Sequence, residues 1–258
     1  MKRKLMIISL VLAIVVSFAS SGLSQELSGD EVLDRVKETM NANTIEMNFR
    51  MELHSSEGDI RERQLKIYSK EGEGDTNKAL IRFLEPASVE GTGFLNLVEE
   101  NQEDMYLFLP AIGSVRRIAS GQRSGSFVGT EFSYNDLSVL GGGNFQEDYQ
   151  PTVIEENEKE YIIRIDPTAE SNQYEYGIMH VQKSNWFPAR IEFYDSNEEL
   201  WKVLTNENFS EQGDYLMAEK ITMKNVQKGT KTVLYLNEVT YDGQIDDDIF
   251  TTRYLERY

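Results

Sequence analysis

The amino-acid sequence predicts a mainly β protein in which one antiparallel sheet curls around its own apolar side. In residues 45–53 apolar and polar side chains strictly alternate, which is typical of a strand with one buried and one wet face. Similar runs recur almost to the end of the chain, and turn signals such as Gly213-Asp214 and Lys228-Gly229 separate many of them. No helical segments alternate with these strand-like runs. The runs therefore predict an antiparallel meander of about 11 to 13 strands.

The N-terminal residues have the order of a secretory signal peptide. Basic residues 2–4 precede an apolar run at 5–18, which at about 14 residues is shorter than the roughly 20 needed to span a bilayer. We expect residues 1–24 to be removed and residues 25–258 to form a single domain. Since the chain has no cysteine, we expect no lipid attachment and no disulfide. These features predict a periplasmic protein without a lipid anchor.

One amphipathic helix is expected before the first strand. Ser28 and Glu31 form a capping-box signal, which predicts a helix over about residues 29–43. The apolar residues that follow at helical spacing are Val32, Leu33, Val36 and Met40.

The predicted sheet is too wide for this helix to cover. About 11 to 13 strands at roughly 4.8 Å spacing exceed about 50 Å, whereas a helix of about 15 residues is only some 22 Å long. The sheet must therefore curl, and residues 133–140 are the other candidate cover. A curled sheet with short covers favours an apolar cavity, and a fully packed barrel core is the alternative.

The strand at residues 45–53 directs its apolar side chains to the inner face of the sheet. Methionine is flexible, so a face rich in methionine adapts to irregular apolar ligands, and it equally suits a packed core. The residues expected to line a ligand cavity are Ile45, Met47, Phe49, Met51, Leu53, Met105 and Leu107.

Arg82 lies between Leu80 and Leu84 on one face of its predicted strand, which is an unusual place for a charge. One interpretation is a polar contact to a lid or to a ligand head group. The other is an arginine that extends to solvent or lies on an edge strand.

A basic, glycine-rich segment interrupts this acidic chain. Residues 105–130 contain no Asp, Glu or Lys, and glycines at 121, 125 and 129 suit a mobile loop. We interpret the segment as a lid with a basic, anion-binding rim, because guanidinium groups match phosphate and similar anions. In the alternative, the arginines pair with nearby carboxylates such as Glu131 or Asp136. The residues assigned to the lid and rim are Arg116, Arg117, Arg123, Phe127, Phe132 and Tyr134.

The composition argues against several classes of function. With 44 acidic and 26 basic residues the formal charge is −18, which repels nucleic acid, so no nucleic-acid partner is expected. Two histidines, His54 and His180, offer little for a triad or a metal site, and no glycine-rich phosphate loop is present. We expect no metal and no cofactor. The acidic run at residues 246–248 predicts a capped turn before Phe250 instead of a calcium loop.

Four stretches resemble, in order, the outer-membrane lipoprotein-sorting proteins, the relatives of the periplasmic lipoprotein carrier and its outer-membrane receptor. They are ALIRFLEP (79–86), DMYLFLPAIGSVRRI (104–118), WFPARIEFYD (186–195) and IFTTRYLER (249–257). The resemblance implies a strongly curved antiparallel half-barrel with helical lids over an apolar concavity that receives acyl chains. In the periplasmic carrier, an arginine shortly before the strand that resembles residues 79–86 latches the lid. The corresponding residues 74–77 of this chain contain no arginine.

The resemblance and the residues together predict a non-enzymatic periplasmic carrier or chaperone. Its partners would be the acyl chain of a lipoprotein or lipid and an inner-membrane transporter complex, and it would act as a monomer. The alternative is an envelope sensor or adaptor that binds a partner protein through the same curved sheet. A hydrolase is the third interpretation.

Overall fold

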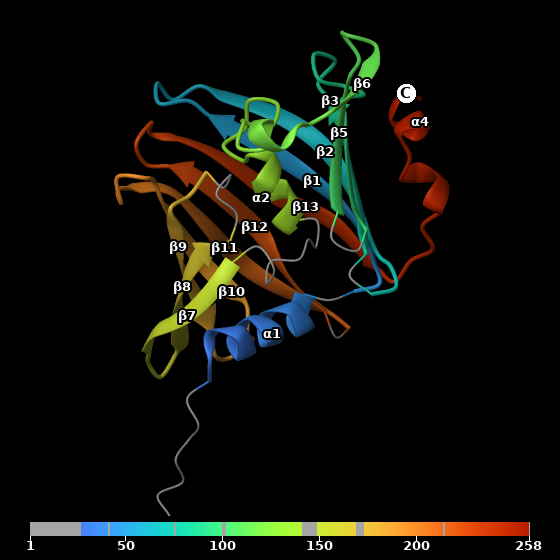
Figure 1. Ribbon diagram of the computed structural model, residues 1–258. Helices are drawn as coiled ribbons and strands as arrows, with labels where there is room; N and C mark the ends of the chain where they lie inside the picture. The colour runs from blue at the N-terminus through green and yellow to red at the C-terminus, as the bar shows by residue number, and fades with distance from the viewer. Residues whose placement is uncertain are drawn as a thin grey trace, which may run out of the picture.

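The structure, a computed structural model, describes residues 27–40, 42–74, 76–99, 102–140, 149–168, 173–213 and 215–257. The expected signal peptide at residues 1–24 lies outside these ranges. In the described part of the chain, 13 strands form one antiparallel sheet that curves and does not close (Figure 1). The predicted mainly β fold is confirmed, at the upper end of the expected number of strands.

Neighbouring strands in the sheet are consecutive in the chain, except that the first strand also pairs with the last. This pairing places Met51 opposite Leu234 near the middle of the sheet. From one edge to the other the strands are β6 (Ser114–Arg117), β5 (Gln102–Leu109), β4 (Gly93–Glu99), β3 (Asn77–Glu85), β2 (Ile60–Glu71), β1 (Thr44–His54), β13 (Thr230–Tyr241), β12 (Tyr215–Asn225), β11 (Leu200–Gln212), β10 (Pro188–Tyr194), β9 (Tyr176–Gln182), β8 (Glu160–Pro167) and β7 (Tyr149–Glu156).

The N-terminal helix α1 (Gly29–Met40) packs against β7 and β12 through its buried apolar stripe. Its capping box forms as predicted, since the Ser28 amide donates to Glu31 Oε2 (2.8 Å) and the Glu31 amide donates to Ser28 Oγ (3.2 Å). The helix ends before the predicted residue 43, because the Asn43 amide already donates to Asp242 Oδ1 (3.1 Å) at the start of β1. No helix in the described ranges has the length and apolar composition needed to cross a membrane.

A mid-chain segment covers the concave face, as the sequence predicted. It contains the 3-10 turn η1 (Ser120–Gln122) and helix α2 (Tyr134–Leu140), which lies inside the curve of the sheet (Figure 1). Ser133 and Asp136 cap α2 reciprocally, since the Ser133 amide donates to Asp136 Oδ2 (2.7 Å) and the Asp136 amide to Ser133 Oγ (3.1 Å). We call residues 121–137 the lid.

The C-terminal residues cover part of the opposite, convex face (Figure 1). This C-terminal segment, residues 245–257, contains the 3-10 turn η2 (Asp247–Ile249) and the short helix α4 (Thr252–Leu255). Asp246 caps η2 by accepting a hydrogen bond from the Asp248 amide (3.0 Å), so the turn predicted at this acidic run is confirmed. The buried residues of this convex cluster are Leu80, Leu95, Phe108, Phe250 and Leu255.

Candidate functional site

The predicted cavity residues share the concave side of the sheet. Ile45 is partly buried and packs against the main apolar cluster, in which the other residues are buried. Successive side chains of a strand point to opposite faces of the sheet. The alternation of apolar and polar residues therefore predicted that these side chains share one apolar layer. The buried members are Met47, Phe49, Met51, Leu53, Met105 and Leu107.

The lid fills the concavity with aromatic side chains. Phe127 and Phe132 are each 1% exposed. The ring of Phe127 lies 5.6 Å from the rings of Phe83 and Phe94 and 5.7 Å from that of Tyr134, within the range of favourable aromatic pairs. The glycines of this segment suggested a mobile loop, but its apolar residues are packed as a core.

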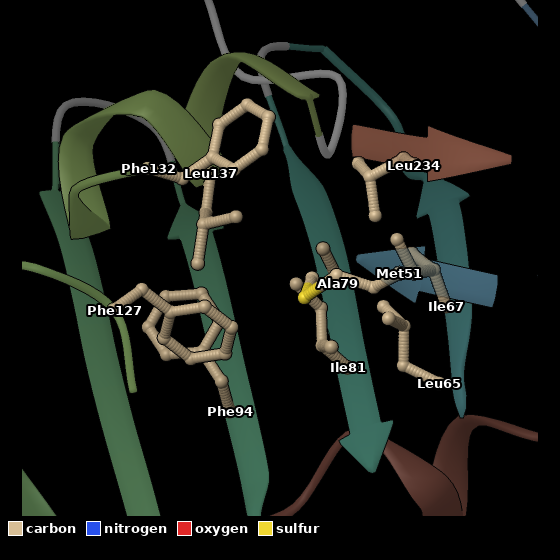
Figure 2. Close-up of a pocket in the computed structure, with 10 residues that line it drawn as sticks. All are labelled: Met51, Leu65, Ile67, Ala79, Ile81, Phe94, Phe127, Phe132, Leu137 and Leu234. Atoms are coloured by element: carbon tan, nitrogen blue, oxygen red, sulfur yellow. The ribbon is translucent and has the colours of Figure 1, made fainter. Parts of the chain in front are cut away.

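A small apolar cavity remains between the lid and the sheet. Its volume is about 20 Å³, and the lid side chains Phe127, Phe132 and Leu137 face the sheet across it (Figure 2). Of the residues predicted for the concave wall, Met51 lines this cavity. The complete lining is Met51, Leu65, Ile67, Ala79, Ile81, Phe94, Phe127, Phe132, Leu137 and Leu234.

Glu131 anchors one side of the lid to the sheet. Its amide donates to Thr232 Oγ1 (2.9 Å), and its carbonyl accepts from Lys202 Nζ (2.7 Å). Its carboxylate accepts from the Thr230 hydroxyl (2.6 Å) and from Asn225 Nδ2 (3.0 Å). Backbone and side chain of one lid residue are therefore bound by β11, β12 and β13.

Lys202 is a buried cation that the sequence analysis missed. Its side chain is 7% exposed, and burial lowers the pKa of its ammonium group. Nζ lies 3.9 Å from Asp136 Oδ2 and 4.9 Å from the centre of the Trp201 ring. Lys202 lies two residues before the buried Leu204 on the same face of β11. The alternation of this strand therefore indicated that the Lys202 side chain points inward.

Asp136 anchors the lid a second time. Its Oδ1 accepts a hydrogen bond from the Tyr174 hydroxyl (3.0 Å), and Gln173 Nε2 donates to Ser133 Oγ (2.7 Å). Burial, and then the charge of Asp136, raises the pKa of Tyr174 well above its usual value. The Tyr174 hydroxyl therefore stays protonated and remains a donor to the lid.

Arg63 of β2 provides a third contact to the lid. Its Nη1 donates to the Val128 carbonyl (2.8 Å), and its guanidinium carbon lies 5.4 Å from the centre of the Phe83 ring. The residue is 8% exposed, and burial lowers its pKa. Arg63 thus contacts the lid from β2, at a position different from residues 74–77, where the resemblance had led us to look for such an arginine. Arg63 lies on the same face of β2 as Leu65, and this spacing was the sequence feature that could have predicted its burial.

The three predicted rim arginines do not gather into one anion site. Arg123 Nη1 is paired with Glu103 Oε2 (2.6 Å), and Arg117 is paired with Asp104. Arg116 is exposed beside Tyr134, where its charge opposes the rise in the pKa of Tyr134 that burial causes. The carboxylate partners come from β5, whereas the sequence analysis had considered Glu131 and Asp136.

Arg82 lies on the convex face, away from the lid. Its Nη1 donates to the carbonyls of Gly91 (2.8 Å) and Leu255 (3.0 Å), and its Nη2 to that of Tyr254 (3.2 Å). Arg82 therefore holds the C-terminal segment, a partner that neither interpretation of this residue had included.

Each of the two histidines lies beside a carboxylate. His54 Nε2 is 2.9 Å from Glu52 Oε2, and His180 Nδ1 is 3.3 Å from Glu160 Oε2. Within the residues that the structure describes, no group of three His, Cys, Asp or Glu side chains is placed to hold a metal ion.

Comparisons with known proteins find the same fold elsewhere. Residues 75–257 match the model of a family described as "Uncharacterized protein". A solved outer membrane lipoprotein-sorting protein domain from Vibrio parahaemolyticus is 29% identical, with a TM-score of 0.82, over 89% of this chain and 98% of its own. No match was found among curated proteins.

Two further solved structures are more distant in sequence and share the fold. A DUF1329 family protein from Desulfovibrio piger is 24% identical over 88% of this chain and 97% of its own, with a TM-score of 0.81. A LolA superfamily protein from Nitrosomonas europaea is 21% identical over 88% of this chain and 99% of its own, with a TM-score of 0.68.

Proposed function

The chain belongs to the family whose model matches residues 75–257 and is similar to an outer-membrane lipoprotein-sorting protein domain; from this premise we propose that it is a periplasmic carrier for an acylated ligand. The ligand, a lipoprotein or a lipid, binds in the apolar concavity that the lid covers. The protein moves it between the inner and the outer membrane and needs no catalytic step.

The observation that supports this proposal is the way the lid closes the concavity. The lid places Phe127, Phe132 and Leu137 against an apolar wall, while the neighbouring lid residues Val128, Glu131 and Asp136 make its polar contacts. An acyl chain offers the same apolar contacts as these three side chains. Burying it contributes about 0.8 kcal/mol per methylene, so about ten buried methylenes correspond to roughly 8 kcal/mol.

The lid must leave the wall before such a ligand can bind. The remaining cavity of about 20 Å³ is far smaller than the roughly 300–1,000 Å³ of typical ligand pockets. We therefore assign the described arrangement to the closed, empty state. Ligand and lid compete for one apolar surface.

The proposed compartment rests on the N-terminal sequence and on the family. Residues 1–24 are removed on export, and the chain carries no cysteine for a lipid anchor. A carrier in this compartment receives its ligand from a membrane complex, which we propose to be an inner-membrane transporter.

Two substitutions on neighbouring residues of β2 test the binding site. Leu65 lines the cavity and Gln64 is exposed on the other face. We expect Leu65→Asp to abolish binding of the fluorescent fatty acid cis-parinaric acid, because a carboxylate in the apolar wall is costly to bury. Gln64→Asp should bind like the wild type. If a folded Leu65→Asp protein, as judged by circular dichroism, binds normally, the concavity is not the site.

Lipid extraction supplies a test that requires no substitution. Protein purified from its own cell envelope without detergent should carry acyl lipid or lipoprotein, detected by mass spectrometry of the extract. A stable complex with another protein and no acyl component would favour the sensor or adaptor instead.

A further inference from the structure

The groups that hold Glu131 belong to the sheet, so they remain in place when the lid moves. Lys202 lies on β11, Asn225 ends β12, and Thr230 and Thr232 lie at the start of β13. All four bind a single lid residue: Asn225 Nδ2 and the Thr230 hydroxyl donate to the Glu131 carboxylate, Lys202 Nζ donates to its carbonyl, and Thr232 Oγ1 accepts from its amide. Ammonium, amide and hydroxyl donors are the groups that bind carboxylate and phosphate oxygens in proteins.

Opening the lid changes the charge balance of the concave face. In the described part of the chain, the hydrogen-bond and ion-pair partners of Arg63 and Lys202 all lie on the lid, at Val128, Glu131 and Asp136. Arg63 is 8% and Lys202 6% exposed. Removing the partner of a buried charge is strongly unfavourable. Opening the lid would take the Asp136 carboxylate away from Lys202 and the Val128 carbonyl away from Arg63, so two cations of the concave face would lose the oxygen atoms that they bind.

The donors lie at the border of the apolar wall. Thr232 is two residues from Leu234 on the same face of β13, and Leu234 lines the cavity opposite Met51. A head group bound by Lys202 and Thr232 would thus direct its chain over Leu234 and Met51 toward the apolar wall.

We propose that Lys202, Asn225, Thr230 and Thr232 form a binding site for the anionic head group of the acyl ligand, and that Glu131 of the lid occupies this site in the closed state. Its carboxylate then accepts from Asn225 and Thr230 and its carbonyl from Lys202. The inference rests on the proposed carrier function and narrows its ligand to an amphiphile with a carboxylate or phosphate group. It also moves the anion site away from Arg117 and Arg123, which Asp104 and Glu103 already neutralise.

The decisive variant is Lys202→Met, measured with two probes of the same chain. The probes are cis-parinaric acid, which carries a carboxylate, and its neutral methyl ester. Lys202→Met removes one contact to the lid, so the ester should bind as well as before or more tightly. It also removes the head-group cation, so the ratio of acid to ester affinity should fall at least about tenfold, the effect expected for loss of a charge-assisted hydrogen bond.

Two more variants separate the head-group site from the lid. Glu131→Gln should tighten binding of both probes, because the lid is held less firmly and the site is less occupied. Glu103→Gln is the matched control, since it removes the charge that pairs with the lid residue Arg123 and leaves the four residues of the sheet site untouched. It should leave the acid-to-ester ratio unchanged.

The source of the anion is tested by competition. Lysophosphatidic acid and lauric acid, added to protein that holds parinaric acid, compare phosphate with carboxylate, and the stronger competitor identifies the preferred group. If Lys202→Met does not fold, Thr230→Val removes one peripheral donor and should lower the ratio by a smaller factor. The head-group site would be overturned if folded Lys202→Met binds both probes with an unchanged ratio of acid to ester affinity. If Lys202→Met does not fold, the same result in Thr230→Val would overturn it. In either case the carrier function would still stand. Failure of the wild type to bind either probe would reject both.

Discussion

Two parts of the sheet differ in how their convex faces are covered. In β3 to β5, which we call the clamped wing, the lid packs on the concave face and the C-terminal segment on the convex face (Figure 1). In β8 to β10, the open wing, the convex face carries polar and aromatic side chains such as Arg164, Tyr176 and Tyr194. The lid's Phe127 closes against Phe83 and Phe94 of the clamped wing. The clamped wing is therefore held from both sides, and it would serve as the fixed wall that the proposed movement of the lid requires.

The largest expected effect comes from truncating the convex side of the clamped wing. Leu95 is fully buried under the C-terminal segment, whereas Ile178 on the convex face of the open wing is half-buried. We expect Leu95→Ala to lower the free energy of unfolding by about 2–5 kcal/mol and Ile178→Ala by less than about 1.5 kcal/mol. Urea unfolding measures both. Equal losses would show that the two wings are held alike.

The second prediction concerns the glycine on which the C-terminal segment rests. A Cβ at Gly93 would lie 2.7 Å from Leu255 Cδ2 and 2.9 Å from Arg82 Nη1, whereas Gly121 has open space around it. Gly93→Ala should therefore destabilise the protein by about 1–3 kcal/mol through overpacking. The C-terminal segment should become sensitive to protease while Gly121→Ala behaves like the wild type. An intact C-terminal segment in Gly93→Ala would mean that it does not depend on this contact.

The third prediction concerns the lid contact of Arg63. Arg63→Gln should reduce the free energy of lid opening by about 1 kcal/mol, because the charge-assisted hydrogen bond to Val128 is lost while the burial of a cation is relieved. Amide hydrogen exchange should accelerate in residues 123–137 and stay unchanged in β3 and β4. The exposed Arg61→Gln is the control. Exchange that accelerates equally in wall and lid would contradict a fixed wall.

The smallest expected effect is a dependence of the C-terminal segment on pH. Lys70 and Lys78 lie 3.0 and 3.1 Å from the Asp247 carboxylate and hold its pKa below the usual value. Since the pKa of Asp247 is lowered in the folded state, its contribution is present at neutral pH. That contribution is lost as the pH falls below about 4 through the folded pKa. Asp247→Asn should remove this part of the acid sensitivity, as thermal melts at pH 7 and pH 3 would show.

The fold was readable from the sequence because alternation reports which face of a strand is buried. The same pattern assigned the concave residues Met47 to Leu53 correctly to one layer. The packing of the C-terminal segment on the convex face was not predicted. β3 does contain a continuous apolar run at residues 79–81, which is typical of a strand covered on both sides. Its cover comes from the other end of the chain, and strand patterns carry no information about such tertiary contacts.

The candidate site was predicted in its apolar half and missed in its polar half. The aromatic residues of the lid were found because they stand out in a glycine-rich segment. Lys202 and Arg63 were missed, because a single cation within a strand is usually solvated, although the faces they share with Leu204 and Leu65 pointed inward. The pairing of Arg117 with Asp104 follows from the register of β5 and β6, and that of Arg123 with Glu103 follows from the way the lid folds back onto β5. No local sequence pattern specifies either contact.

A reversible lock on the lid tests the central claim most directly. The chain contains no cysteine, and the Glu131 amide lies 2.9 Å from Thr232 Oγ1, so the pair Glu131→Cys and Thr232→Cys can join the lid to β13. The measurement is binding of the neutral parinaric methyl ester to this variant before and after reduction. The account predicts no binding to the oxidised protein and binding at least as tight as that of the wild type once the disulfide is reduced, because the reduced variant lacks the contacts of Glu131 and Thr232 that hold the lid. Equal binding by the oxidised and reduced forms would contradict the claim that lid and acyl chain compete for the same wall.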